Sequence, residues 1–190
     1  PTWNAEMAGL PLYLDGDGLL RYFPVEAHAG SDVLTAYVLA IAHEAGYSIP
    51  DDARAQMVEG LRGFVAGRLH RDSVWPAADF SIRKLAAIDA LSRYGAAEPS
   101  MLTSIALEPA LWPTSAVLDW LALLERESDV PRRAARMDDA WQILRSRLNF
   151  QGTQMGFSTE RNDALWWLML SGDVNAARAV LAEYGFGAPA

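Results

Sequence analysis

The stretch VLTAYVLAIAHEA, residues 33–45, decides the fold class of this chain. Its apolar side chains fall on almost every side of a helix, which is typical of a helix that is buried on most sides. The next segment, residues 50–69, places its apolar residues at helical spacing on one face and its charges on the other. A buried helix followed by an amphipathic one predicts a hairpin with one inner and one outer helix.

The same alternation recurs along the chain. The mostly apolar segments are residues 33–45, 82–94, 115–124 and 163–170, and their amphipathic partners are residues 50–69, 100–107, 131–148 and 174–184. Residues that favour helix N-caps stand just before each apolar segment, near positions 31, 79, 114 and 158. These starts are 48, 35 and 44 residues apart, and such a spacing is typical of stacked αα-hairpins.

Two helical layers predict an all-α fold, specifically an α/α toroid or part of one. We expect at least seven helices, counting the segments above. We expect no strands, because no run shows sustained period-two alternation of β-branched residues. The predicted core includes Tyr37, Leu85, Leu118 and Trp166, which lie within the four apolar segments.

Composition limits the function classes. The chain has 190 residues, 51% of them hydrophobic, and no cysteine, so a disulfide framework, a zinc–thiolate site and a cysteine nucleophile are excluded. A net charge of −8 repels phosphate backbones, so we expect no nucleic-acid partner. No apolar run approaches the ~20 residues that a membrane helix needs, so we expect no direct membrane contact by this domain.

The first 30 residues differ from the rest of the chain. They contain a tight turn at Asp15-Gly16-Asp17-Gly18 and a breaker at Phe23-Pro24, and they are expected to be an irregular lead-in. Residues 31–190 are expected to form the helical domain. The start at Pro1, with no initiator Met and no leader pattern, favours a piece of a larger protein.

Acidic residues near the inner-helix starts are the first candidates for chemistry. They are Asp32, Asp79, Glu160 and Asp163, with Trp75, Trp112, Trp166 and Trp167 nearby. In toroidal glycosidases, paired carboxylates and sugar-stacking aromatic residues occupy this place. The competing interpretation is that these carboxylates cap helices or form salt bridges, and this is the one that we expect.

The remaining candidates predict no metal or catalytic site. His28, His43 and His70 lack the i, i+4 spacing of a zinc helix. His43 and His70 are expected at helix C-termini, where a cation suits the helix dipole. The Asp15–Gly18 turn lacks calcium-loop features, because Leu19 and Leu20 occupy the positions of a required oxygen ligand and a required glycine. We therefore predict no catalytic residues, no cofactor-binding residues and no metal.

Four segments resemble the bacterial alpha-2-macroglobulin family. Residues 30–46, GSDVLTAYVLAIAHEAG, are similar to the Trp-Leu-Thr-Ala-Tyr-Val segment in the thioester domain of alpha-2-macroglobulins and complement component three, with Asp32-Val33 in place of the usual Trp. RKLAAIDALSRYG at 83–95, WPTSA at 112–116 and GFSTE at 156–160 resemble further segments in the same order. The resemblance covers about residues 10–185 and implies an α/α toroid.

The resemblance implies a part in protease inhibition. Members of the family are large traps: a protease cleaves a bait region, the molecule rearranges, and a Cys–Gln thioester is exposed that captures the attacker. Bacterial members are periplasmic and often lipid-anchored to the inner membrane. The expected partners are therefore proteases, through the full-length parent, and other domains of the same chain.

The sequence departs from the family at the thioester. The Cys-x-Glu-Gln motif should precede the Thr-Ala-Tyr helix, and the chain has no cysteine. Either the fragment starts after that motif, or the parent belongs to a subgroup that lacks the thioester. Some complement members use a loop His to catalyse acyl transfer; residues 72–79 contain none, and we do not assign that role to His70. The rival hypotheses are a toroidal carbohydrate-active enzyme and a helical-repeat interaction module.

Overall fold

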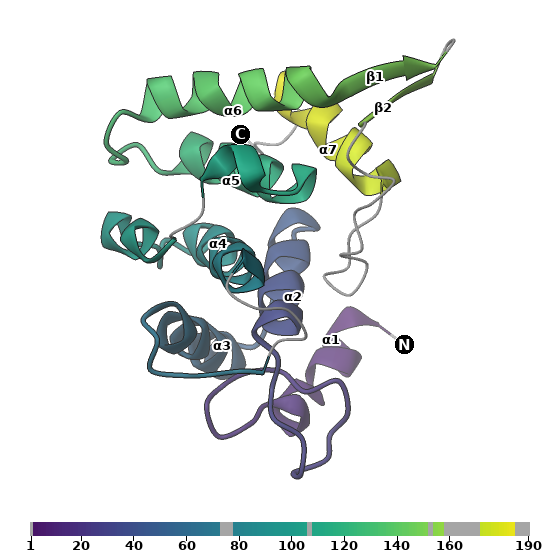
Figure 1. The fold of residues 1–190 in the computed structure, drawn as a ribbon. Helices are drawn as coiled ribbons and strands as arrows, with labels where there is room; N and C mark the ends of the chain where they lie inside the picture. Colours follow the sequence, from purple (N-terminus) through teal and green to yellow (C-terminus); the bar gives the residue numbers. More distant parts are fainter. Residues whose placement is uncertain (1, 73–77, 106–107, 152–153, 158–171, 185–190) are drawn as a thin grey trace. The chain divides into compact units, whose positions relative to one another are not determined.

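The computed structural model describes residues 2–72, 78–105, 108–151, 154–157 and 172–184. The chain divides into two compact units, Pro1–Ala106 and Leu107–Ala190. Both are mainly helical, so the all-α prediction is confirmed, and seven α-helices lie within the described residues (Figure 1). None of the helices in these ranges is both long and apolar enough to cross a bilayer.

The predicted lead-in is more ordered than expected. It contains the short helix α1, Trp3–Met7, and the 3-10 helix η1, Leu10–Tyr13. Pro11 suits the first turn of η1 because its missing N–H has no partner to lose there. Leu10 and Leu14 are buried, so hydrophobic packing holds this segment to the first unit.

Helix α2, Asp32–Glu44, forms where the apolar stretch predicts it. Ser31 caps the helix, since its hydroxyl accepts a hydrogen bond from the N–H of Leu34 at 3.2 Å. The prediction that Tyr37 belongs to the core is wrong: its exposed fraction is 40%. Only the opposite face of α2, which includes Leu39, packs on helices α3 and α4, so the face with Tyr37 is left open to solvent.

Helix α3, Asp51–Val65, is the expected amphipathic partner of α2 and packs against it. It ends four residues before the predicted boundary, because Gly67 adopts a left-handed conformation with φ +75° just after the C-cap residue. Its buried residues include Met57, Leu61 and Phe64, while its charged residues face outward. The amphipathic character predicted for this segment is therefore confirmed.

Helix α4, Ala78–Ser92, packs against both α2 and α3. It is buried on nearly all sides, and Leu85 is fully inaccessible, as predicted. The expected helix over residues 100–107 is instead the 3-10 helix η2, Pro99–Ser104, which contacts α4. Pro99 starts η2, and six residues are too few for a stable α-helix.

The second unit begins with the 3-10 helix η3, Pro109–Leu111. Helix α5, Thr114–Arg126, follows and is buried on most sides; Leu118 is 3% exposed, so its predicted place in the core is confirmed. Helix α6, Arg133–Arg147, and helix α7, Gly172–Tyr184, both pack on α5. The predicted inner helix over residues 163–170, with Trp166, lies outside the described residues.

A hairpin follows α6, contrary to the expectation of no strands. Strand β1, Leu148–Gln151, pairs antiparallel with strand β2, Gln154–Phe157, and Leu148 lies opposite Phe157. Neither strand contains a β-branched residue, so the sequence carries no strand signal. Backbone pairing and burial of Phe157, which is 7% exposed, hold the hairpin.

Candidate functional site

The carboxylate of Asp32 is held in a buried ion pair. Asp32 lies in the first turn of α2, and Arg83 reaches it from α4. Arg83 Nε donates to Oδ2 at 2.9 Å and Nη2 donates to Oδ1 at 2.5 Å, while the guanidinium stacks 5.3 Å from the Phe64 ring centroid. A carboxylate engaged on both oxygens is not poised as a general acid or base. The expected salt-bridge role of Asp32 is confirmed.

Among the other residues considered for a glycosidase arrangement, Trp112 has its side chain within the described part of the chain. Trp112 is buried and meets Trp120 edge to face, with ring centroids 5.8 Å apart. It therefore packs in the core of the second unit and presents no sugar-stacking face. Asp79 lies in α4; its side chain, and the residues Glu160, Asp163, Trp75, Trp166 and Trp167, lie outside the described part.

The Asp15–Gly18 turn is organised around its own carboxylate. Asp15 Oδ1 accepts hydrogen bonds from the N–H groups of Asp17 and Leu19, at 3.0 and 2.9 Å, and Oδ2 accepts one from the N–H of Gly30 at 2.7 Å. Burial by itself raises the pKa of Asp15, but these backbone donors and the charge of Arg71 lower it, and the net shift is downward from 3.8. The turn interpretation is confirmed.

The cation that this turn binds is an arginine side chain. Arg71 Nη2 lies 2.8 Å from Asp15 Oδ2 and 2.7 Å from Asp17 Oδ2, and its Nε donates to the carbonyl of Gly30 at 2.8 Å. Among the described residues, no cluster of three or more His, Cys, Asp or Glu side chains could hold a metal ion. The two turn carboxylates thus serve a structural ion pair.

The three histidines have separate surroundings. His43 lies in the last turn of α2, as predicted, and packs edge to face on Tyr94 with ring centroids 5.5 Å apart. The prediction that His70 ends a helix is wrong, because α3 stops at Val65. His28 lies in the loop after Leu20, where its backbone carbonyl accepts a hydrogen bond from Arg21 Nε at 2.8 Å.

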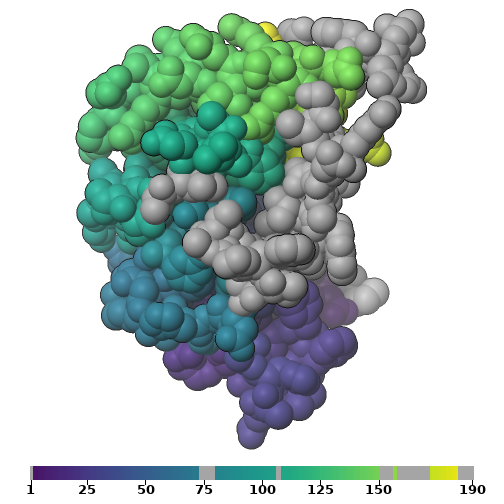
Figure 2. All heavy atoms as spheres, in the orientation of Figure 1, coloured from purple at the N-terminus to yellow at the C-terminus, as the bar shows by residue number. Residues whose placement is uncertain are grey.

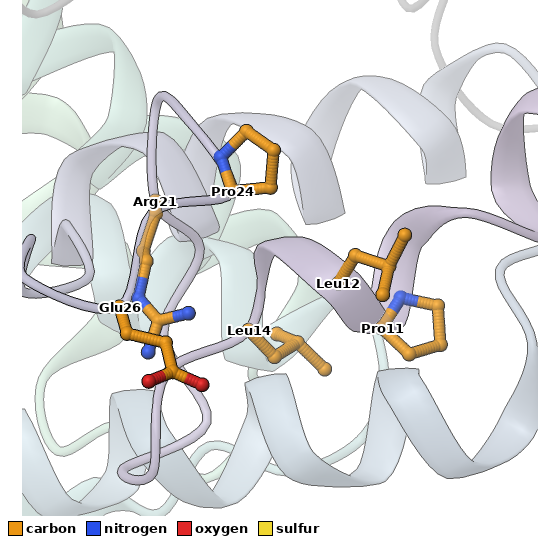
Figure 3. A pocket seen from close by; sticks show the side chains of 6 residues that line it. All are labelled: Pro11, Leu12, Leu14, Arg21, Pro24 and Glu26. Atoms are coloured by element: carbon orange, nitrogen blue, oxygen red, sulfur yellow. The ribbon is translucent and has the colours of Figure 1, made fainter.

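The best candidate for a binding surface lies on the first unit. An open hollow of about 710 Å³ is lined by Pro11, Leu12, Leu14, Arg21, Pro24 and Glu26. Figure 3 shows Arg21 and Glu26 at one end of the view, Pro11 and Leu12 at the other, and Leu14 between them. The lining thus combines four apolar side chains with one charge of each sign.

Several large apolar side chains in the same stretch of sequence as the lining residues are exposed to solvent. Their exposed fractions are 70% for Leu12, 51% for Tyr22, 66% for Phe23 and 47% for Val25. In Figure 2 the purple and blue atoms of this N-terminal region form part of the molecular surface. Exposed apolar patches mark protein interaction sites, and three of these side chains fall within residues 22–25, so this segment suits contact with another protein surface.

Sequence reasoning missed this apolar surface. Phe23-Pro24 signalled only a chain break, and the exposure of a lone apolar residue cannot be read from an irregular segment. A usable signal was present, because four large apolar residues fall between positions 19 and 23 with no helical or strand period. Leu19 and Leu20 are buried, whereas Tyr22 and Phe23 are exposed.

The fold has counterparts among solved structures. No protein-family model matches the chain, and no curated protein matches it. A crystal structure of native alpha-2-macroglobulin from Escherichia coli, spanning domain MG7 to the C-terminus, matches 73% of this chain with 21% identity and a TM-score of 0.57. A cryo-EM reconstruction of the native conformation of E. coli alpha-2-macroglobulin matches 97% of it with 20% identity and a TM-score of 0.58.

These matches show the class of fold. The chain has the helical fold of a part of a bacterial alpha-2-macroglobulin, and the resemblance found in the sequence is confirmed at that level. The chain spans 22% of the first matching structure's length and 12% of the second's. What it resembles is thus one portion of a much larger protein.

Proposed function

We propose that this chain is the thioester-type helical domain of a bacterial alpha-2-macroglobulin-like protein that traps attacking endopeptidases. The observation that carries the proposal is the fold match over nearly the whole chain, together with four resembling segments in the same order. Residues 31–190 supply the αα-hairpins of an α/α toroid, and residues 1–30 lead into them. In this proposal the parent protein is periplasmic, and a lipid anchor on the inner membrane, which bacterial members of the family often have, fits that place.

The domain itself is non-catalytic in this proposal. The ion pair of Asp32 with Arg83 supports this role, because it engages a carboxylate that a glycosidase would need free. The burial of Trp112 supports it as well. Covalent capture by the parent would need an acyl donor with a thiol leaving group, which must come from a cysteine outside these 190 residues.

The exposed apolar surface around the hollow supports contact with other domains of the same chain. Phe23 and Leu12 are each about two-thirds exposed in this chain alone, at 66% and 70%. In the full-length parent, Phe23→Ser should lower the melting temperature, because a buried aromatic contact is lost. In the isolated chain the same change should have almost no effect, and an equal drop in both would contradict the domain contact.

The trap is tested with the full-length parent and trypsin. The parent should block cleavage of a large protein substrate while a small chromogenic substrate is still hydrolysed, because a caged protease admits only small molecules. The isolated chain of 190 residues should block neither and should form no adduct on a denaturing gel. If the parent blocks the small substrate equally, it acts by plugging the active site and the trap is excluded.

The thioester is tested in the same protein. A parent that carries Cys-x-Glu-Gln upstream should release one thiol per chain on treatment with methylamine, since the amine attacks the acyl group and displaces the thiolate. The matched control is the parent with that cysteine replaced by alanine, which should release none. A parent that lacks the motif and still protects trypsin would belong to the subgroup that traps without a covalent bond.

A further inference from the structure

The two ends of the loop formed by residues 15–30 lie side by side in the first unit. Gly30 N–H donates to Asp15 Oδ2 at 2.7 Å, so the first and last residues of the loop are joined directly. Arg71, which follows α3, bonds both ends at once: Nη2 to Asp15 Oδ2 at 2.8 Å and Nε to the Gly30 carbonyl at 2.8 Å. A compact loop of this length with adjacent ends is an Ω-loop. Figure 1 shows it between α1 and α2.

Arg71 also neutralises the carboxylate charge at the neck of the loop, which is the place where Asp15 and Gly30 meet. The Asp15 side chain is 8% exposed, and Asp17 adds a second carboxylate that binds the same Nη2 atom at 2.7 Å. Without Arg71, the buried Asp15 carboxylate would lack a counter-charge and would face a like charge. Loss of the Arg71 side chain should therefore destabilise the neck far more than the loss of an exposed ion pair would.

Beyond the neck, the loop has a packed part and an exposed part. The Gly18 backbone lies close to Gln56 of α3, and Asp17 and Leu19 lie close to Gly60 of the same helix. Leu19 and Leu20 are buried, Ser31 N–H donates to the Leu20 carbonyl at 2.7 Å, and Leu20 N–H donates to Thr35 Oγ1 at 2.8 Å. Residues 22–29 are all exposed. The helices beneath have a core of their own, which includes Leu39, Met57, Leu61, Phe64 and Leu85.

We propose that Arg71 is a latch that closes the 15–30 loop, and that residues 21–30 open as one unit when this latch is broken, while residues 17–20 stay packed and α2, α3 and α4 stay folded. Local units of low stability that open separately from the core are common in proteins. Arg21, Pro24 and Glu26 belong to the loop, whereas Pro11, Leu12 and Leu14 precede it. The latch therefore also determines whether the hollow exists, and with it the shape of the exposed apolar surface.

The latch is tested by amide hydrogen exchange in the chain of 190 residues. The reporters are the N–H groups of Arg21, Gly30 and Ser31, which bond within or beside the loop, and the references are amides in the middle of α3 and α4. Arg71→Ala should speed exchange at the reporters by roughly tenfold or more and at the references by less than about twofold. Arg71→Lys should give an intermediate effect, because it keeps the charge but loses the fork of donors.

The matched control is Arg68→Ala. Arg68 is three residues away and pairs with Glu59 on the surface at 3.0 Å, with both side chains more than half exposed, so its loss should leave the reporters unchanged. Equal acceleration of reporters and references in Arg71→Ala would show that the loop opens only by global unfolding and would overturn the proposal. Unchanged reporters would overturn it too. If Arg71→Ala does not fold, Asp15→Asn is measured in its place, with the same two overturning outcomes.

Discussion

Arg83 on α4 and Asp32 on α2 form a doubly hydrogen-bonded ion pair across 51 residues of sequence, and their side chains are only 3% and 2% exposed. The pair joins the first half of α4 to the first turn of α2. A charge pair so deeply buried carries a desolvation cost close to its Coulombic gain. Removing one partner should therefore lower the stability of the first unit by more than the intact pair contributes to it.

Replacing one partner of this pair should be costly, whereas replacing both should not. Arg83→Met should lower the free energy of unfolding by about 3–5 kcal/mol, because Asp32 is left as an uncompensated buried charge. The double change Asp32→Leu with Arg83→Met should restore stability to near the wild-type value or above it. Urea unfolding measures both, and a double variant as unstable as Arg83→Met would contradict this account.

The exposure of Tyr37 predicts a sharp contrast with a close neighbour on α2. Leu39 is fully buried, so Leu39→Ala should lower the free energy of unfolding by about 2–5 kcal/mol. Tyr37 is 40% exposed, so Tyr37→Ser should lower it by less than about 1 kcal/mol. Both variants keep the helix, and thermal unfolding followed by circular dichroism distinguishes them. Similar losses would place Tyr37 in a buried contact.

The Asp15 carboxylate should contribute stability that acid removes. Its pKa is lowered in the folded state, so the contribution is present above the unfolded value of 3.8 and is lost as the pH falls below it. Asp15→Asn should lower the free energy of unfolding at pH 7 by about 2–3 kcal/mol, since charge-assisted hydrogen bonds are weakened. The difference from wild type should shrink below about pH 4. Asp17→Asn, at a half-exposed position, is the matched control and should cost under about 1 kcal/mol.

Lys84, the single lysine, should destabilise the fold at neutral pH. It is 8% exposed, its ammonium lies 4.9 Å from the Phe80 ring centroid, and no carboxylate of the described residues pairs with it. Burial lowers its pKa below 10.5 in the folded state. Folding therefore disfavours the proton, and the contribution of Lys84 to stability should rise with pH up to about 10.5.

Lys84→Met tests this directly. The variant should gain roughly 1–3 kcal/mol at pH 7, because a buried cation with no carboxylate partner among the described residues becomes a side chain of similar shape without charge. Its stability should rise less between about pH 8 and 10 than that of the wild type. Measurements stop there because Tyr94, whose pKa burial raises above 10.0, makes stability fall at higher pH. A loss of stability in Lys84→Met would show that the ammonium makes a favourable contact.

Much of the burial of the helices could be predicted from local patterns. The segments around Leu85 and Leu118 are apolar on most sides, and both residues are buried as expected. Asp32 was expected to cap a helix or to form a salt bridge, and it does form one. These predictions succeeded because helical periodicity and the preference of carboxylates for helix N-termini act over a few residues.

The rest depended on contacts that no local pattern contains. Tyr37 and Leu39 both have apolar neighbours in the sequence. Only the placement of α3 and α4 on one side of α2 decides that Tyr37 is exposed and Leu39 is buried. The β1–β2 hairpin forms with no β-branched residue in either strand, and it depends on the backbone pairing of two segments that follow α6.

The sequence by itself determined the helical class, the burial of the segments around Leu85 and Leu118, and the absence of a thiol on which to build a thioester. Tertiary structure alone decided the cation that binds the Asp15–Gly18 turn, because Arg71 comes from 56 residues downstream. It also decided which apolar residues remain exposed around the hollow. The physical reason is that periodicity reports on neighbours along one helix, whereas ion pairing and exposure depend on which segments meet in space.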